Sequence, residues 1–444
     1  MAELNVLGHL FLTVFLSNFS TFMVIPVTID VTMSAICPGE VECSLAIYLS
    51  AFQQAIAGIG TLVVMPLVGN LSDKCGRKAL LTVPMTLTII PLAILAYSRT
   101  RNFFYAYYVL KTLTSMICEG CVQCLALAYV ADNVPENSRA SVFGILSGIA
   151  SAAFVCGNFS ARFLSTAATF QVSTAVSMIA LVYMRVFLQD SIIEDKLAVP
   201  ILSGSKVKVD NARPKQISDK KIQVFKTMPS LEDITCLLKT SKTFSQAAIV
   251  AFFGNLSEVG LYASLLYYLK ARFHFDKDHF ADLMVIGGIA GTISQLLVMP
   301  ILAPILGEGR LLSIGLFFSC AHMLLYGIAW SSWVPYAAAM LSIFFVFAQP
   351  CVRSIVSKQV GACEQGKAQG CISGICSFAN VVSPLVFSPL TAMFLSEDAP
   401  FYFPGFSIIC TGIISMIAFI QSLMIRVPPP ISIPGITNGN YVDA

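Results

Sequence analysis

Twelve apolar stretches, each long enough to cross a membrane as a helix, dominate the chain. A spanning helix needs about 20 apolar residues. The stretches run over roughly 6–29, 44–69, 79–97, 103–130, 140–164, 170–188, 244–269, 281–306, 310–330, 333–356, 368–395 and 402–425. Lipid offers the backbone no hydrogen-bonding partner, so each stretch is expected to be helical. Only 11% of the residues are charged, against about 25% in soluble domains. We therefore predict an all-α integral membrane protein with twelve transmembrane helices.

One long polar segment divides these stretches into two groups of six. Residues 189–243 are rich in charge and poor in aromatic residues, which is typical of a flexible linker. The sequence thus predicts an N-terminal six-helix bundle over 1–188, a second over 244–425, and a polar tail over 426–444. Within the linker, "PSLEDITCLLK" has an apolar stripe at helical spacing, which predicts a short amphipathic helix near 230–240 at the membrane surface.

The two groups of six resemble each other in three places. "GILSGI" at 144–149 matches "GCISGI" at 370–375, and "LVVMP" at 62–66 matches "LLVMP" at 296–300. A third match aligns Asn18 with Asn255. The matches occur in the same order in both halves. Because each half has an even number of spans, the halves share one topology, as in carriers built from two parallel six-helix pseudo-repeats.

Basic residues indicate the orientation in the membrane. With the linker's Lys and Arg left out, ten basic residues fall on the side of the linker and both termini, and six fall on the opposite side. The excess favours a multi-pass protein with both termini in the cytoplasm. The plasma membrane and an internal membrane such as the vacuole both remain open. Cys37 and Cys43 share the first outer loop, where a disulfide and two free thiols are both compatible with the sequence.

The stretch "GNLSDKCGRK", between the second and third spans, gathers four charges into six positions. It resembles the signature of the major facilitator superfamily, G-x-L-x-D-[RK]-x-G-R-[RK]. The matching residues are Gly69, Leu71, Asp73, Lys74, Gly76, Arg77 and Lys78. The corresponding stretch of the second half, "PILGEGR", keeps Gly309 and Arg310. We expect Gly307 to stand there in the place of Asp73.

Two longer stretches resemble the tetracycline-resistance-like branch of that superfamily, which includes the hippocampus-abundant-transcript-like proteins. They are "AYVADNVPENSRASVFGILSG" and "EQGKAQGCISGICSFANVVSP". The resemblance implies the major facilitator fold and a secondary transporter, often proton-coupled, that works by alternating access. Drug antiporters of the superfamily often carry a Gly-Pro pair in the fifth span. Ala161 and Arg162 stand there instead, so symport, antiport and uniport, and import and export, stay open.

The family pattern also implies a conformational latch on the cytoplasmic face. Asp73 is expected to meet the N-terminal end of span 11 near Gly370, where unpaired backbone N–H groups favour an anion. Arg77 is expected to reach Asp132 at the end of span 4. Such contacts would form when the inner side is closed. The alternative is that the basic residues of the stretch only fix the topology.

Three ionisable residues lie deep within predicted spans: Lys111, Glu119 and Glu258. Buried charges of this kind are functional candidates by default. We favour Glu258 as the proton-coupling site, with Glu119 as the second candidate. A static ion pair with Lys111 is the structural alternative. Lys111 is also a candidate contact for an anionic substrate.

Three amides, Asn18, Asn255 and Gln349, lie in the spans expected to surround the cavity. Each is a candidate for hydrogen bonding a substrate. Buried amides equally serve to join helices to one another.

Other signals do not support a catalytic function. "GACEQGKA" at 361–368 imitates a nucleotide-binding loop but lacks the final Ser/Thr and the preceding strand. The spacing of Cys118, Cys121 and Cys124 matches no established metal site. We therefore expect a non-enzymatic carrier without metal or cofactor, active as a monomer. Its partners would be the lipid bilayer, protons and a small organic solute, with no nucleic acid. An uncoupled facilitator and a non-transporting receptor or trafficking protein are the alternatives.

Overall fold

The computed structural model describes residues 2–36, 44–190, 241–275, 277–361, 364–395 and 399–425. Within these ranges the secondary structure is helical, with no strand, and twelve segments are long and apolar enough to cross a membrane. The prediction of an all-α protein with twelve transmembrane segments is confirmed. The predicted helix near 230–240, the tail over 426–444, and Cys37 and Cys43 lie outside the described residues.

The helices fall into two groups on either side of the linker. The first group comprises α1 (Ala2–Ile36), α2 (Ser44–Cys75), α3 (Arg77–Tyr97), α4 (Arg101–Cys118), α5 (Cys121–Asn133), α6 (Arg139–Ala161) and α7 (Thr166–Phe187). The second comprises α10 (Lys242–Phe273), α11 (Lys277–Ile293), α12 (Met299–Leu306), α13 (Glu308–Gly327), α14 (Val334–Met340), α15 (Ser342–Phe345), α16 (Ala348–Ser357), α17 (Gln365–Leu395) and α18 (Phe406–Leu423). We call these groups the N-half and the C-half.

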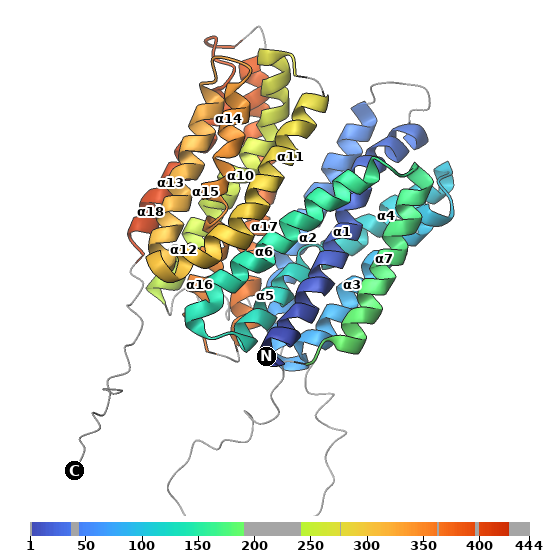
Figure 1. Ribbon diagram of the computed structural model, residues 1–444. Helices are drawn as coiled ribbons and strands as arrows, with labels where there is room; N and C mark the ends of the chain where they lie inside the picture. Colours follow the sequence, from blue (N-terminus) through green and yellow to red (C-terminus); the bar gives the residue numbers. More distant parts are fainter. Residues whose placement is uncertain are drawn as a thin grey trace, which may run out of the picture.

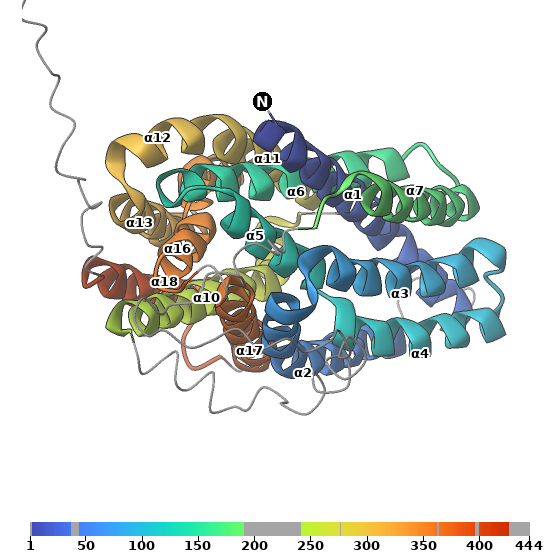
Figure 2. The same ribbon diagram turned by 90° about the horizontal axis from the view of Figure 1, so that it is seen from below.

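The two halves stand side by side and touch along two seams (Figures 1 and 2). In one seam α2 packs against α17, and in the other α6 packs against α11, α12 and α16. The end of α7 and the start of α10 lie at the same end of the molecule, which we call the linker side. Apart from Ala140 of α6, which packs into the C-half core, the main apolar core of each half is formed by its own residues.

Glycines allow α2 and α17 to approach closely on the linker side. A Cβ atom added at Gly69 would collide with the carbonyl oxygen of Gly366, and one added at Gly370 would collide with that of Met65. Small residues at helix crossings bring backbones together in the absence of a hydrophobic driving force between helices. The close contact of α2 with α17 in the first seam therefore requires glycine at positions 69 and 370.

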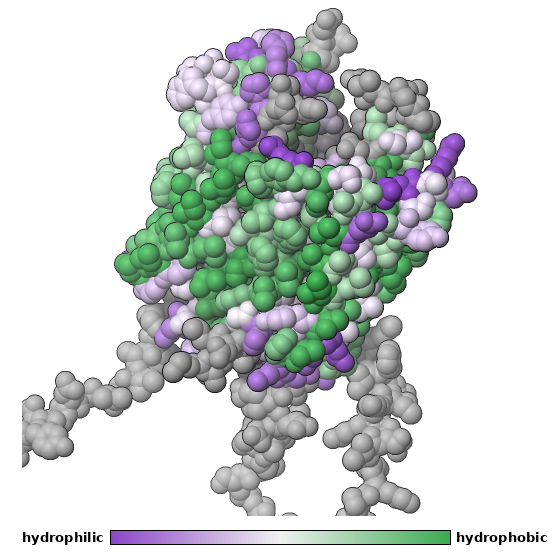
Figure 3. Space-filling view, turned by 45° about the vertical axis from the view of Figure 1, so that its right-hand side comes forward, coloured by the Kyte–Doolittle hydropathy of each residue, from purple (hydrophilic) through white to green (hydrophobic). Residues whose placement is uncertain are grey.

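The outer surface matches a membrane environment. Figure 3 shows a broad apolar band around the middle of the molecule, with polar residues towards both ends. Large apolar side chains remain exposed within the spans, for example Leu297 and Ile305. On the side opposite the linker, Trp330, Trp333 and Tyr402 are exposed. Such aromatic side chains favour the headgroup region of a bilayer.

Two spans predicted as continuous helices are interrupted. The span from Arg101 to Asn133 breaks between α4 and α5, where Gly120 adopts a left-handed φ of 74°. The span from Val334 to Ser357 consists of the three short helices α14, α15 and α16. Apolar content identifies a span but not a break within it. Interrupted helices at membrane depth are tolerated where they face protein or a cavity.

The signature stretch, expected to be an inner loop, is helical except at Gly76. α2 continues to Cys75 and α3 begins at Arg77, so the turn between them is Gly76 alone, with φ of 93°. The C-half repeats this geometry at Gly307, with φ of 79°, immediately before α13. Gly307 is therefore the counterpart of Gly76, and its expected alignment with Asp73 is wrong. The alignment failed because the C-half turns seven residues after Pro300, whereas the N-half turns ten residues after the matching Pro66. Glu308 is the counterpart of Arg77 and carries the opposite charge.

Candidate functional site

The Asp73 carboxylate connects the two halves on the linker side. Its Oδ1 accepts a hydrogen bond from the backbone N–H of Gly366, and its Oδ2 accepts one from that of Lys367, each at 2.8 Å. Both N–H groups belong to the first turn of α17, where helical partners are lacking and the helix dipole attracts an anion. Asp73 thus bonds the start of α17 one turn before Gly370, the residue expected near it. Gly370 instead lies where α2 and α17 approach closely.

Arg77 holds that carboxylate in place from within the N-half. Its guanidinium donates to Asp73 and to Ser72, and its Nε donates to Asp132 Oδ2 at 2.9 Å. The guanidinium side chain is 4% exposed, so its charge depends on these carboxylates for compensation. Lys74 is exposed at the edge of this group. We call Asp73, Arg77 and Asp132 the linker-side clamp.

The C-half contains an ion pair in the equivalent place with the charges exchanged. Glu308, the first residue of α13, pairs with Lys358 at 2.8 Å, just past the end of α16. Its Oε1 also accepts a hydrogen bond from Ser354 at 2.7 Å. Its Oε2 is the single buried side-chain polar atom without a hydrogen-bond partner among the described residues. This pair joins helices of one half and does not cross between halves.

The second seam is joined by hydrogen bonds at two depths. On the linker side Arg139 donates to the backbone oxygen of Ser357 at 3.3 Å and to its hydroxyl at 3.1 Å. Deeper in the membrane, Ser151 donates to Gln295 at 3.0 Å. Gln295 lies in the π-helical turn Ser294–Val298. The hydrogen bonds between the halves thus reach from the linker side to the wall of the C-half cavity, which Ser151 and Gln295 line.

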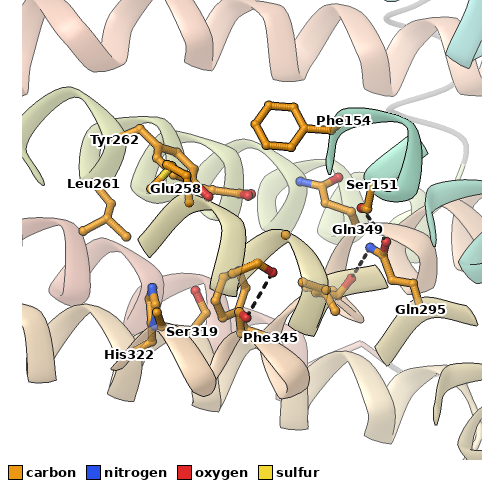
Figure 4. A pocket seen from close by; sticks show the side chains of 18 of the residues that line it. Ser151, Phe154, Glu258, Leu261, Tyr262, Gln295, Ser319, His322, Phe345 and Gln349 are labelled. Carbon is orange, nitrogen blue, oxygen red and sulfur yellow. Dashed lines mark hydrogen bonds between the residues drawn. The ribbon is translucent and has the colours of Figure 1, made fainter. Parts of the chain in front are cut away.

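Two of the predicted candidates, Glu258 and Gln349, line a cavity of about 570 Å³, which we call the C-half cavity. Glu258 and Tyr262 come from α10, His322 from α13, and Gln349 from α16. Figure 4 shows Glu258 beside Tyr262, with Ser151 and Gln295 joined at the other end of the cavity. Apolar side chains fill most of the remaining wall, a composition typical of small-molecule sites.

Glu258 lacks a compensating charge in this cavity. It forms no ion pair or hydrogen bond with any residue of the described ranges. A lone carboxylate at membrane depth is costly to keep ionised. The C-half cavity can therefore hold either a proton on this group or a cation beside it.

His322 lies in the same cavity with a defined tautomer. Its Nδ1 lies 2.7 Å from the backbone oxygen of Ala338, which can only accept, so Nδ1 carries the proton in the neutral ring. The ring packs edge-on against Tyr326 and near Phe345. Sequence reasoning did not single out this residue, because one His in an apolar span usually indicates a core position.

Lys111 and Glu119 line a second cavity of about 620 Å³, the N-half cavity, together with Gln53, Gln54, Tyr107 and Thr28. The two do not form an ion pair, so a static pair with Lys111 is absent for both Glu119 and Glu258 in the described structure. Glu119 sits at the break between α4 and α5 and is exposed to the cavities rather than packed.

A third cavity of about 590 Å³, the interface cavity, lies between the halves. Its polar wall residues include Gln54, Glu119, Gln123, Arg353, Ser373 and Asn380. Glu119 and Gln54 also line the N-half cavity, and Tyr262 also lines the C-half cavity, so the three cavities adjoin. Arg353 was not singled out in the sequence because it lies near the end of its span, where a basic residue normally indicates only topology.

The three predicted amides have different surroundings. Gln349 lines the C-half cavity. Asn255 donates to the backbone oxygen of Cys376 at 3.0 Å and to the side chain of Asn380, so it joins α10 to α17. Asn18, half-buried on α1, does not contribute to the walls of the three cavities described.

Two six-helix halves around adjoining central cavities, with seams on one side, form the architecture of a membrane carrier. A family model, the Major Facilitator Superfamily, matches residues 10–384. The chain belongs to this superfamily.

Curated relatives support the same family. The chain is 24% identical over 348 residues to the human Hippocampus abundant transcript 1 protein, covering 78% of this chain and 66% of that protein. The match thus spans slightly less than two thirds of the relative's length. The chain is also 22% identical over 341 residues to the class E tetracycline resistance protein of Escherichia coli, covering 75% and 76% of the two chains.

Solved structures show the same fold. The crystal structure of the human organic anion transporter MFSD10 matches with a TM-score of 0.77 and 17% identity, over 95% of this chain and all of that one. The Major Facilitator Superfamily transporter FucP, in the outward conformation, matches with a TM-score of 0.68 and 12% identity, over 96% and 100%.

Proposed function

We propose that the protein is a secondary active transporter that carries a small organic solute by alternating access, driven by protons. The observation that carries this proposal is the lone Glu258 carboxylate in the C-half cavity. A transporter that binds and releases a proton needs a carboxyl group that is accessible from a cavity and not neutralised by a fixed cation. Glu119, which lines two of the three cavities, is the second candidate for this role.

Alternating access requires contacts that can close one side and then release. The linker-side clamp and the Arg139–Ser357 contact join the halves on the linker side. We infer that they hold a state in which the cavities open to the opposite side. The excess of basic residues on the linker side supports a cytoplasmic linker, and the state held by these contacts would then face outward. The protein would act as a monomer in the plasma membrane or an internal membrane.

The names of the relatives leave the substrate open. They include a transporter of organic anions, proteins of tetracycline resistance, and a fucose:proton symporter. An anion, a polycyclic drug and a neutral sugar have little chemistry in common. The substrate class must therefore be argued from the cavities of this chain.

Proton-driven flux in vesicles tests the proposal. Purified protein is reconstituted with a pH-sensitive dye inside, and benzoate, fucose and tetracycline are offered separately under an imposed proton gradient. Solute uptake accompanied by proton movement supports coupling, and Glu258→Gln is expected to abolish the proton movement while leaving the protein folded. Loss of proton movement in Glu119→Gln alone would transfer the role to Glu119.

The same experiment separates the alternatives. Uptake without proton movement identifies an uncoupled facilitator. Solute binding without uptake identifies a transporter-like receptor, and the proposed transport would then be wrong. Intact contacts in the linker-side clamp favour a moving transporter, because a static receptor has no need to hold one side closed.

A further inference from the structure

Arg353 presents a positive charge to the interface cavity without a carboxylate to balance it. None of the ion pairs among the described residues includes Arg353. Arg353 is half-buried, whereas Arg77, which is buried on the linker side, contacts two carboxylates. A cation taken into a membrane protein without a partner is costly, and such groups mark sites for ions or charged substrates.

The hydrogen bonds of Arg353 fix its position and leave half of its guanidinium free. Nη1 alone donates, to the backbone oxygen of Gln369 at 3.0 Å, to its side-chain oxygen at 3.4 Å and to the hydroxyl of Ser373 at 2.9 Å. Nε and Nη2 donate to no atom in the described part of the chain, and neither is among its buried unpaired atoms. Both donors are therefore accessible, and Arg353 lines the interface cavity, so they are available to a solute there. A guanidinium edge of this kind matches the two oxygens of a carboxylate.

A neighbouring amide adds donors to the same wall. Asn255 donates to the side-chain oxygen of Asn380, which fixes the orientation of the Asn380 amide and leaves its NH₂ group available. Asn380 is exposed and lines the interface cavity with Arg353. The wall formed by α16 and α17 thus offers donors and positive charge, which suits an oxyanion.

Glu119 lies on the wall of the same cavity that the N-half provides, and it forms no ion pair with Arg353. Its negative charge opposes an anion in the cavity. Removing the charge of Glu119 should therefore favour a carboxylate solute at Arg353. The loss of Arg353 and the loss of the Glu119 charge should change the affinity for acids in opposite directions.

We propose that Arg353 is the substrate-carboxylate site of this carrier and that the transported solute is a small organic carboxylate. This inference rests on the proposed transport function and names its substrate class. The solute's carboxylate would occupy the free edge of Arg353, with Asn380 beside it. The interface cavity, at about 590 Å³, has the size of small-ligand sites.

Matched acids and amides test the site by binding alone. Thermal unfolding of the purified full-length protein is followed in titrations with nicotinate against nicotinamide and benzoate against benzamide, at constant ionic strength. The acids are expected to raise the unfolding temperature and the amides are not. Arg353→Gln should weaken acid binding at least about tenfold, because a charge-assisted pair is lost. Glu119→Gln should strengthen it.

The control variant is Arg310→Gln, which removes the same charge from an exposed position and should bind acids as the unaltered protein does. Arg353→Lys keeps the charge without the planar fork and should give intermediate affinity, which covers the case in which Arg353→Gln does not fold. Equal responses to acid and amide, no response to any acid, or unchanged affinity in both Arg353 variants would overturn the inference.

Flux separates this inference from the proposed function. If acids bind through Arg353 but never enter vesicles, transport is wrong and the binding site stands. If a neutral solute is transported at the same rate by Arg353→Gln and the unaltered protein, transport stands and the carboxylate site is wrong.

Discussion

At the scale of single residues, Asp73 is the carboxylate of the linker-side clamp that bonds across to the other half. It bonds two N–H groups at the start of α17 and a guanidinium of its own half. The family pattern and helix-dipole reasoning predicted that Asp73 meets the start of this helix near Gly370, and the hydrogen bonds lie one turn earlier. The pair that Asp73 forms with Arg77 was not predicted. Arg353 could not be predicted in the same way. Arg353 is a candidate binding residue because it has no ion-pair partner among the described residues, and this can be seen only in the folded structure.

Replacing Asp73 by Asn should weaken the closed linker side. The amide cannot supply charge to the α17 terminus and places an NH₂ group against either N–H donors or Arg77. A charge at a partly buried helix terminus contributes up to about 2 kcal/mol, so we expect the balance of states to move several-fold towards opening on the linker side. Distance distributions between spin labels on the two halves measure this balance. Lys74→Gln, which alters an exposed neighbour, should leave it unchanged.

At the scale of elements, the breaks in the spans are the features that sequence reasoning could not supply. The α4–α5 break depends on Gly120 in a left-handed conformation, yet an isolated Gly in an apolar stretch is compatible with a continuous helix. The break exposes Glu119 to two cavities. The length and composition of the spans could be read directly because hydrophobic burial in lipid requires about 20 residues per helix.

Gly120→Ala tests whether the break is a fixed part of the fold. Its positive φ penalises a Cβ atom by about 1–2 kcal/mol, and the added atom would also press against the Met65 side chain. We expect a lower unfolding temperature. We also expect that Glu119→Gln no longer changes the response of the unfolding temperature to added acid in this variant. Gly8→Ala is the control, because its Cβ meets open space within α1 and should not lower the unfolding temperature.

The Glu308–Lys358 pair offers a second test at this scale. Breaking one partner of a buried pair costs on the order of 3 kcal/mol, so Glu308→Lys should sharply destabilise the C-half, because it opposes two like charges. The exchange variant Glu308→Lys with Lys358→Glu should recover most of the unfolding temperature. A double variant no more stable than Glu308→Lys alone would show that the pair does not act as a unit.

At the scale of the whole molecule, seams on one side predict unequal access to the interior. Cys376 lines the interface cavity and is half-buried. A membrane-impermeant thiol reagent should modify it faster when added on the side opposite the linker than on the linker side. Mass spectrometry of the labelled peptide measures both rates, with Cys376→Ser as the blank. Asp73→Asn should bring the two rates closer, and equal rates in the unaltered protein would contradict an outward-facing state.

The exchanged charges of the two halves carry a consequence for ancestry. Gly76 followed by Arg77 and Gly307 followed by Glu308 occupy equivalent turns, yet their partners are Asp132 and Lys358. If the halves descend from one duplicated gene, the sign was reversed at both ends of one pair. Reversing the charge of one residue alone would have placed two like charges together in a buried position. The change is therefore expected to have passed through a variant with an uncharged residue at one of the two positions. Among diverged copies of this gene, the signs at positions 308 and 358 should therefore covary.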